Sequence, residues 1–173
     1  MVTKHGKAPS GQWGPPDPRL IYALGQFVMS WSLIESTLEI GISKQLGLNP
    51  LEASVVTAGL QFRNRAAILL SLLNRDPAAN AAAIKTIKAI QGVSHRNDIL
   101  HSVVGGGANT IWFNRRKTAE QFASKFEVYD LTRLSDASSE CASLAMDLMS
   151  DLGIGRDDYR SFFQEAHNAA NKV

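Results

Sequence analysis

Hydrophobic residues in much of this chain recur every three or four positions, which is the spacing of a helix that buries one face. The longest such run predicts a helix over 18–46, and Asp17-Pro18 supplies a typical helix start. Shorter runs predict helices over 50–59 and 62–73. Each of these helices needs a packing partner for its apolar face, so we expect them to form a bundle. The apolar face of the first helix consists of Leu20, Leu24, Phe27, Trp31, Ile34, Leu38 and Ile42.

A further helix is expected over 78–104, following a second start signal at Asp76-Pro77. The three glycines at 105–107 are expected to end it. In a regular helix Asp98 would project away from the apolar face. The apolar positions of this helix are Ile84, Ile87, Ile90, Val93, Leu100 and Val104.

The pattern changes after the glycines. Two short aromatic and β-branched runs, 111–113 and 126–129, predict the strands of a hairpin. The basic residues between the two runs are expected in their connection. A last long helix is expected from about residue 134 to 152, with Ser135 as its N-cap, and a terminal amphipathic helix over 157–171. We therefore predict an all-α fold of five to six helices with a small β-hairpin excursion over 105–132.

Composition narrows the class of protein. The chain has 173 residues, 45% of them hydrophobic and 20% charged, which is typical of one globular domain. We expect residues 17–173 to form that domain and residues 1–16, rich in proline and glycine, to be a flexible tail. The single cysteine excludes a disulfide framework within the chain. No long apolar run or hydrophobic signal core is visible, so a soluble cytoplasmic protein without membrane contact is expected.

A formal charge of +2 argues against a broad basic surface but leaves room for a local one. The candidate is Arg115, Arg116 and Lys117, close in sequence to the helix that ends at the glycines. Charges on a loop are commonly just solvated, and contact with phosphate groups is the alternative. No histidine pair has the spacing of a helical metal site, so no metal is expected.

Polar residues interrupt the apolar face of the 78–104 helix. Steps of four from Val93 lead to Asn97 and His101, and Arg96 falls on the shoulder of the same face. Uncompensated polar groups in a buried face cost roughly 1–3 kcal/mol each. One interpretation is a satisfied network that fixes helix packing. The other is a functional site.

The stretch Arg96-Asn97-Asp98-Ile99-Leu100-His101 resembles the R-x4-H signature of HEPN domains, in which asparagine often follows the arginine. The resemblance extends over roughly residues 18–152 through the order of the helices. It implies a HEPN-like helical bundle, and in many members a metal-independent ribonuclease of prokaryotic toxin–antitoxin or antiviral defence systems. Such proteins form homodimers with their motifs facing each other, need no cofactor, and pair in some cases with an antitoxin or accessory protein.

The resemblance also implies roles for the catalytic candidates. His101 would take part in proton transfer at the ribose 2′-hydroxyl, Arg96 would hold the scissile phosphate, and Asn97 would bind the phosphate or orient the histidine. The products would be 2′,3′-cyclic phosphate ends. The alternative function is a catalytically inactive HEPN-like dimer that acts as a protein-interaction or nucleotide-binding regulatory module.

Two further residues belong to this hypothesis. Glu35, next to Trp31 on the first helix, is either a solvated edge charge or a carboxylate that orients Arg96. Ser102 stands where many family members have glycine after the motif histidine. Its side chain would narrow the approach to His101, which bears on activity rather than on fold.

Overall fold

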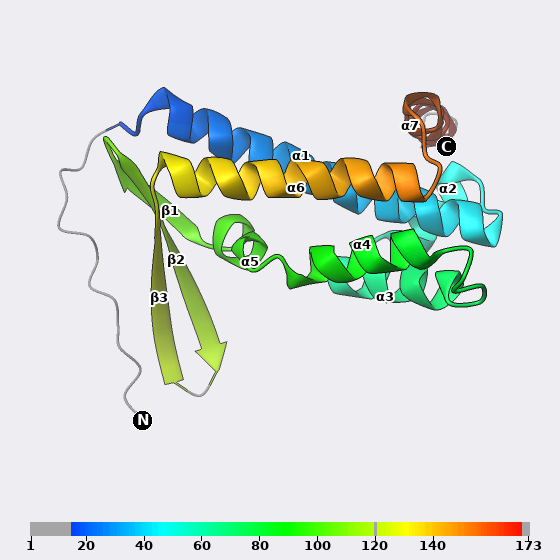
Figure 1. Cartoon of the computed structure of the whole chain (residues 1–173), viewed down its shortest axis with the longest axis horizontal. Coiled ribbons are helices and arrows are strands. Elements are labelled where there is room, and N and C mark those ends of the chain that lie inside the picture. The colour runs from blue at the N-terminus through cyan, green and yellow to red at the C-terminus, as the bar shows by residue number, and fades with distance from the viewer. Residues whose placement is uncertain (1–14, 120, 171–173) are drawn as a thin grey trace. The chain divides into compact units, whose positions relative to one another are not determined.

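The computed structural model describes residues 15–119 and 121–170. Within them the chain forms seven helices and a small antiparallel sheet, so the prediction of a mainly helical fold with a β excursion is confirmed at that level (Figure 1). The predicted tail, 1–16, falls outside the described residues except for its last two positions. In chain order the elements are α1 Pro18–Leu46, α2 Pro50–Thr57, α3 Phe62–Leu73, α4 Ala81–Gly92, α5 His95–Leu100, β1 Val103–Gly107, β2 Thr110–Ala119, β3 Gln121–Tyr129, α6 Leu131–Asp151 and α7 Arg156–Ala170.

The chain divides into two compact units. The first, here the sheet unit, comprises Met1–Met29 and Val93–Cys141, and the second, the helical unit, comprises Ser30–Gly92 and Ala142–Val173. Helices α1 and α6 each contribute one part of their length to each unit. The sheet unit contains α5 and the residues that follow it, and therefore the whole Arg96–His101 motif.

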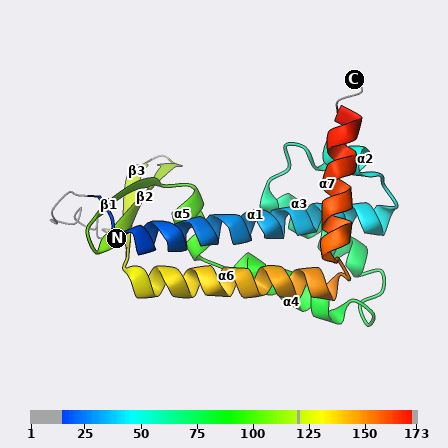
Figure 2. The same cartoon turned by 90° about the horizontal axis from the view of Figure 1, so that it is seen from above.

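In the sheet unit, the three strands pair in the order β1-β2-β3, all antiparallel. The first parts of α1 and α6 lie side by side next to this sheet in both views (Figures 1 and 2). Aliphatic and aromatic side chains of the sheet and of both helices are fully buried. The fully buried residues of this core include Leu20, Phe27, Ile111, Phe113, Tyr129 and Leu134.

The helical unit follows the sequence pattern closely. Gly47 ends α1 with φ +66°, a conformation that favours glycine. Asn49 and Glu52 form a reciprocal capping box at the start of α2. Figure 2 shows α7 crossing the later part of α1. The residues that join α1, α2 and α7 are the buried cluster Ile40, Ala53, Ile154 and Phe162.

The predicted helix over 78–104 is wrong in its extent. The chain forms α4, breaks at Val93-Ser94, restarts as α5 and ends helical structure at Leu100. Gly92 ends α4 and Ser94 lies in the break, and both residue types are weak in helix interiors. The break also changes which residues face inward after it. Asp98 is consequently buried, with only 8% of its surface exposed, where a continuous helix would have turned it outward.

The glycine run belongs to a strand rather than to a helix stop. Val104, Gly105 and Gly106 lie opposite Phe113, Trp112 and Ile111 in the pairing of β1 with β2. A Cβ atom at Gly105 would overlap the indole of Trp112, which shows why a residue without a side chain stands there. Glycine at position 105 therefore allows the Trp112 ring to pack directly against the backbone of β1.

Helix α6 begins three residues earlier than expected. The Oδ1 atom of Asp130 accepts a hydrogen bond from the backbone N–H of Arg133 at 2.8 Å, so Asp130 and not Ser135 caps the helix.

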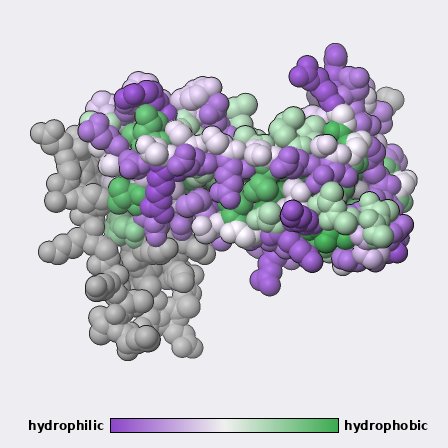
Figure 3. Space-filling model, viewed as in Figure 1, coloured by the Kyte–Doolittle hydropathy of each residue, from purple (hydrophilic) through white to green (hydrophobic). Residues whose placement is uncertain are grey.

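On the face shown in Figure 3, hydrophilic side chains predominate and separate hydrophobic patches interrupt them. The exposed apolar side chains of the sheet unit include Ile21, Tyr22 and Met29 on α1.

Candidate functional site

The motif residues lie on α5 and directly after it. Arg96 and Asn97 are half-buried, and Arg96 Nη1 donates a hydrogen bond to Asn97 Oδ1 at 3.3 Å. His101 is the C-cap residue of α5, with φ −122° and ψ 21°, and its side chain is exposed. Across the described part of the chain, the His101 imidazole makes no hydrogen bond, ion pair or ring contact. The structure thus joins Arg96 to Asn97 and leaves His101 at the surface.

The two additional candidates have different surroundings. Glu35 belongs to the helical unit, where its Oε1 accepts a hydrogen bond from Trp31 Nε1 at 3.0 Å. The Trp31 ring packs against Phe62 with centroids 4.8 Å apart, so Glu35 holds the polar atom of a buried aromatic pair. The hydroxyl oxygen of Ser102 is buried, and among the described residues it has no hydrogen-bond partner.

The basic residues are on a strand and not in a connection, contrary to expectation. Arg115, Arg116 and Lys117 lie on β2, opposite Lys125, Ser124 and Ala123 of β3. The two predicted strands are longer than their aromatic runs because backbone pairing continues through these polar positions. The cluster therefore belongs to the same unit as the motif, on a regular element.

A polar cluster at the other end of α5 was not predicted from the sequence. His95, the first residue of α5, places its Nδ1 atom 2.7 Å from the hydroxyl of Tyr129. The two rings meet edge to face, with centroids 5.6 Å apart. The guanidinium of Arg133 lies over the Tyr129 ring, with its central carbon 4.0 Å from the ring centroid. We call Tyr129, His95, Arg133 and Glu127 the Tyr129 cluster.

Arg133 is held at several points. Its Nη1 donates to the backbone oxygen of Val128 at 2.6 Å, and its Nη2 lies 2.9 Å from a carboxylate oxygen of Glu127. Two edge contacts and the aromatic ring beneath it fix the plane of this guanidinium. The Tyr129 cluster thus presents a side chain of fixed orientation although 41% of the Arg133 side chain is exposed.

Electrostatics keep the Tyr129 hydroxyl protonated. Burial raises the pKa of Tyr129 to about 12, the Arg133 charge opposes this rise, and the carboxylates of Asp98 and Glu127 reinforce it. A phenol with such a pKa remains a hydrogen-bond donor at neutral pH. His95 therefore has a permanent hydroxyl partner.

A hollow of about 610 Å³ opens beside this cluster. We call it the α5–α6 hollow, because His95 supplies one wall and the first turns of α6, with Asp130 before them, supply the others. Its lining combines hydrogen-bond donors with carboxylates, so it suits a polar ligand that carries groups of both kinds. The lining residues are His95, Asp130, Thr132, Arg133, Asp136, Ala137 and Glu140.

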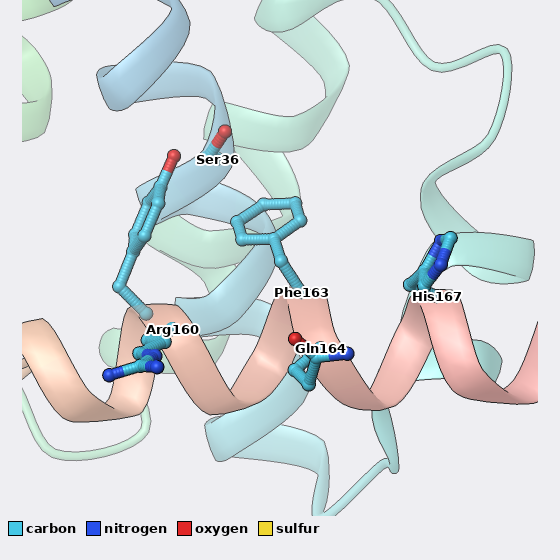
Figure 4. A pocket seen from close by; sticks show the side chains of 6 residues that line it. Ser36, Arg160, Phe163, Gln164 and His167 are labelled. Atoms are coloured by element: carbon cyan, nitrogen blue, oxygen red, sulfur yellow. The ribbon is translucent and has the colours of Figure 1, made fainter.

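A second hollow, of about 490 Å³, lies in the helical unit along α7. Figure 4 shows Ser36 of α1 beside it, and Arg160, Phe163 and His167 succeeding one another along α7. Aromatic rings border it, since Tyr159 and Phe163 pack with centroids 4.9 Å apart. None of the residues that the sequence singled out lines this hollow.

Among residues 15–119 and 121–170, no group of three or more histidine, cysteine, aspartate or glutamate side chains is arranged to hold a metal ion. None of the described helices combines the length and the apolar character needed to cross a bilayer. Comparisons with protein-family models, with curated proteins and with solved structures found no match for this chain.

Proposed function

We propose that this protein is a metal-independent endoribonuclease of the HEPN type, with Arg96, Asn97 and His101 as its catalytic residues. The exposure of His101 at the end of α5 is the observation that supports it. A histidine that only stabilised helix packing would be buried and hydrogen-bonded. A histidine that acts on a polymer must be reachable, and it needs a titratable ring near neutral pH.

The proposed reaction follows from the chemistry of these side chains. The ribose 2′-oxygen attacks the adjacent phosphorus while the bond from phosphorus to the 5′-oxygen breaks. His101 takes the proton of the 2′-hydroxyl, and a proton from the resulting imidazolium or from water goes to the departing 5′-oxygen. The Arg96 guanidinium stabilises the negative charge that develops on the phosphate oxygens, and Asn97 holds the guanidinium from one side. The products are a 2′,3′-cyclic phosphate and a 5′-hydroxyl, and DNA is inert because it lacks the attacking group.

The biological setting rests on the resemblance of the motif alone. We propose a homodimer with facing motifs, RNA as substrate, and a toxin–antitoxin or antiviral defence role in the cytoplasm, with an antitoxin or accessory protein as a further partner. Residues 115–117 on β2 would add positive charge near the RNA backbone.

A second candidate is a non-catalytic interaction module. The hydrogen bond between Arg96 and Asn97 favours it, because both side chains are half-buried and use part of their bonding capacity on each other. In that case the motif would stabilise α5 or an interface and would perform no chemistry.

Incubation of the purified protein with total RNA in EDTA distinguishes the two candidates. We expect the wild-type protein to produce cyclic-phosphate ends, and His101→Ala to reduce the cleavage rate about 10²–10⁴-fold, the usual contribution of a general acid or base. His167→Ala is the matched control, because His167 is also an exposed histidine but lies on α7 in the helical unit.

Arg96→Lys extends the test. It keeps the charge but removes the planar fork that contacts two phosphate oxygens, so cleavage should fall sharply while folding persists. Cleavage by His101→Ala at the wild-type rate would contradict the proposal, and a wild-type protein that leaves RNA intact favours the interaction module.

A further inference from the structure

Tyr129 determines where the neutral His95 ring carries its hydrogen. In the described part of the chain, the only hydrogen-bond partner of the Tyr129 hydroxyl is His95 Nδ1. Tyr129 is fully buried, and a buried hydroxyl hydrogen requires an acceptor. The neutral imidazole therefore accepts at Nδ1 and carries its own hydrogen on Nε2. Because His95 lines the α5–α6 hollow, Nε2–H is a donor available to a ligand there.

Arg133 offers this ligand a flat surface. Its guanidinium plane is fixed by the Tyr129 ring, the Val128 carbonyl and the Glu127 carboxylate, and the residue lines the same hollow. Guanidinium planes stack well on nucleobases, and fixing the plane in advance lowers the entropy cost of binding.

Carboxylates supply the acceptors of the hollow. Asp136 and Glu140 lie one helical turn apart on α6, both exposed, and within the described residues neither makes a hydrogen bond or ion pair. Asp130 is already used as the cap of α6. Three carboxylates around the hollow disfavour a phosphate group, so a neutral ring with its own N–H donors suits the hollow better.

We propose that the α5–α6 hollow binds a guanine base of single-stranded RNA, stacked on Arg133 with its Watson–Crick edge toward Asp136 and Glu140. Guanine presents a ring N–H and an amino group side by side, which one carboxylate can accept together, and its carbonyl oxygen can accept from His95 Nε2–H. Adenine and cytosine lack the ring N–H next to the amino group, and uracil lacks the amino group. The inference rests on the proposed ribonuclease function, since a base bound in the α5–α6 hollow would determine which RNA His101 cuts.

Nucleotide binding to the full-length protein tests this inference without relying on cleavage. The probes are the 5′-monophosphates of guanosine, adenosine, cytidine and uridine, which share one phosphate and differ only in the base. Binding is followed through the imidazole NMR signals of His95, assigned by their loss in His95→Gln. We expect the guanosine nucleotide to bind about ten-fold or more tightly than the other three, the usual value of a bidentate base contact.

Substitutions in the hollow locate the site. The double variant Asp136→Asn/Glu140→Gln should weaken guanosine monophosphate binding about ten-fold or more, since it removes the acceptors. Both side chains are exposed, so the fold should persist. Glu165→Gln is the matched control, because it removes an exposed carboxylate from α7 in the helical unit. It should leave binding unchanged.

The results separate this inference from the proposed function. Equal binding of all four nucleotides, an absence of binding, or guanosine monophosphate binding that the double variant leaves intact would each overturn the guanine site. RNA cleavage without preference for guanine, together with such a result, leaves the ribonuclease proposal standing. Selective guanine binding by a protein that cuts no RNA would support the site and contradict the ribonuclease.

Discussion

His95 and His101 stand at opposite ends of α5 in contrasting surroundings. His95 is half-buried, its Nδ1 is bonded to Tyr129, and its ring packs edge to face against the tyrosine. His101 is exposed, with no bonded partner among the described residues. One imidazole is therefore oriented before any ligand arrives, and the other can adjust to one. An oriented donor suits recognition of a ligand, whereas an accessible ring suits proton transfer.

The largest expected effect is a difference in stability between a substitution at Tyr129, which contacts His95, and one at His101. Tyr129→Ala removes a fully buried ring that also contacts Phe113, His95 and Arg133, so it should lower the free energy of unfolding by about 3–5 kcal/mol. His101→Ala should change it by no more than about 0.5 kcal/mol, as is usual for exposed residues. Urea denaturation measures both values. Similar losses in the two variants would mean that His101 has a structural role.

The second effect appears at alkaline pH. Burial chiefly raises the pKa of Tyr129 to about 12 from an ordinary 10.0, so the folded state holds the phenol hydrogen more tightly than the unfolded state. The resulting stability is fully present below pH 10 and is lost as the pH rises through about 12. The loss should amount to about 3 kcal/mol, since each pKa unit corresponds to about 1.4 kcal/mol.

Tyr129→Phe provides the control for this pH dependence, because it has no hydroxyl to ionise. Its stability should fall less steeply over the same pH range, as measured by denaturation at a series of pH values. Identical pH profiles for the wild type and the variant would show that the ionisation of Tyr129 is not coupled to folding.

Local signals explain how much of the fold the sequence could predict. Each helix-end signal acts only on residues close to it in the sequence. The two ends of α1 could therefore be predicted from Asp17-Pro18 and Gly47, and the start of α2 from the Asn49–Glu52 capping box. The end of helical structure at Leu100 could not be predicted in this way. The strand at Val103–Gly107 forms because it pairs with β2, which is a tertiary interaction that helical periodicity does not encode.

The candidate site divides similarly. Arg96, Asn97 and His101 could be proposed from the sequence because their spacing is local. The Tyr129 cluster was missed because it joins α5 to the β3–α6 junction, across 34 positions of the chain. A signal was present in part: Tyr129-Asp130 places an aromatic strand end directly before a helix cap. Which histidine it contacts depends on the sheet register, and the sequence does not specify that register.

The smallest effect tests the Tyr129–His95 hydrogen bond by itself. At neutral pH, Tyr129→Phe keeps the aromatic contacts and removes only the hydroxyl, so the free energy of unfolding should fall by about 1 kcal/mol.

Diethyl pyrocarbonate attacks the unprotonated nitrogen of a neutral imidazole. In the wild type that nitrogen of His95 is Nδ1, which the hydroxyl covers, so His95 should react several-fold more slowly than the exposed His101. In Tyr129→Phe the His95 rate should rise while the His101 rate stays constant, which peptide mapping of the modified protein measures. If His95 already reacts as fast as His101 in the wild type, the two ends of α5 do not differ in the way that the fixed tautomer requires.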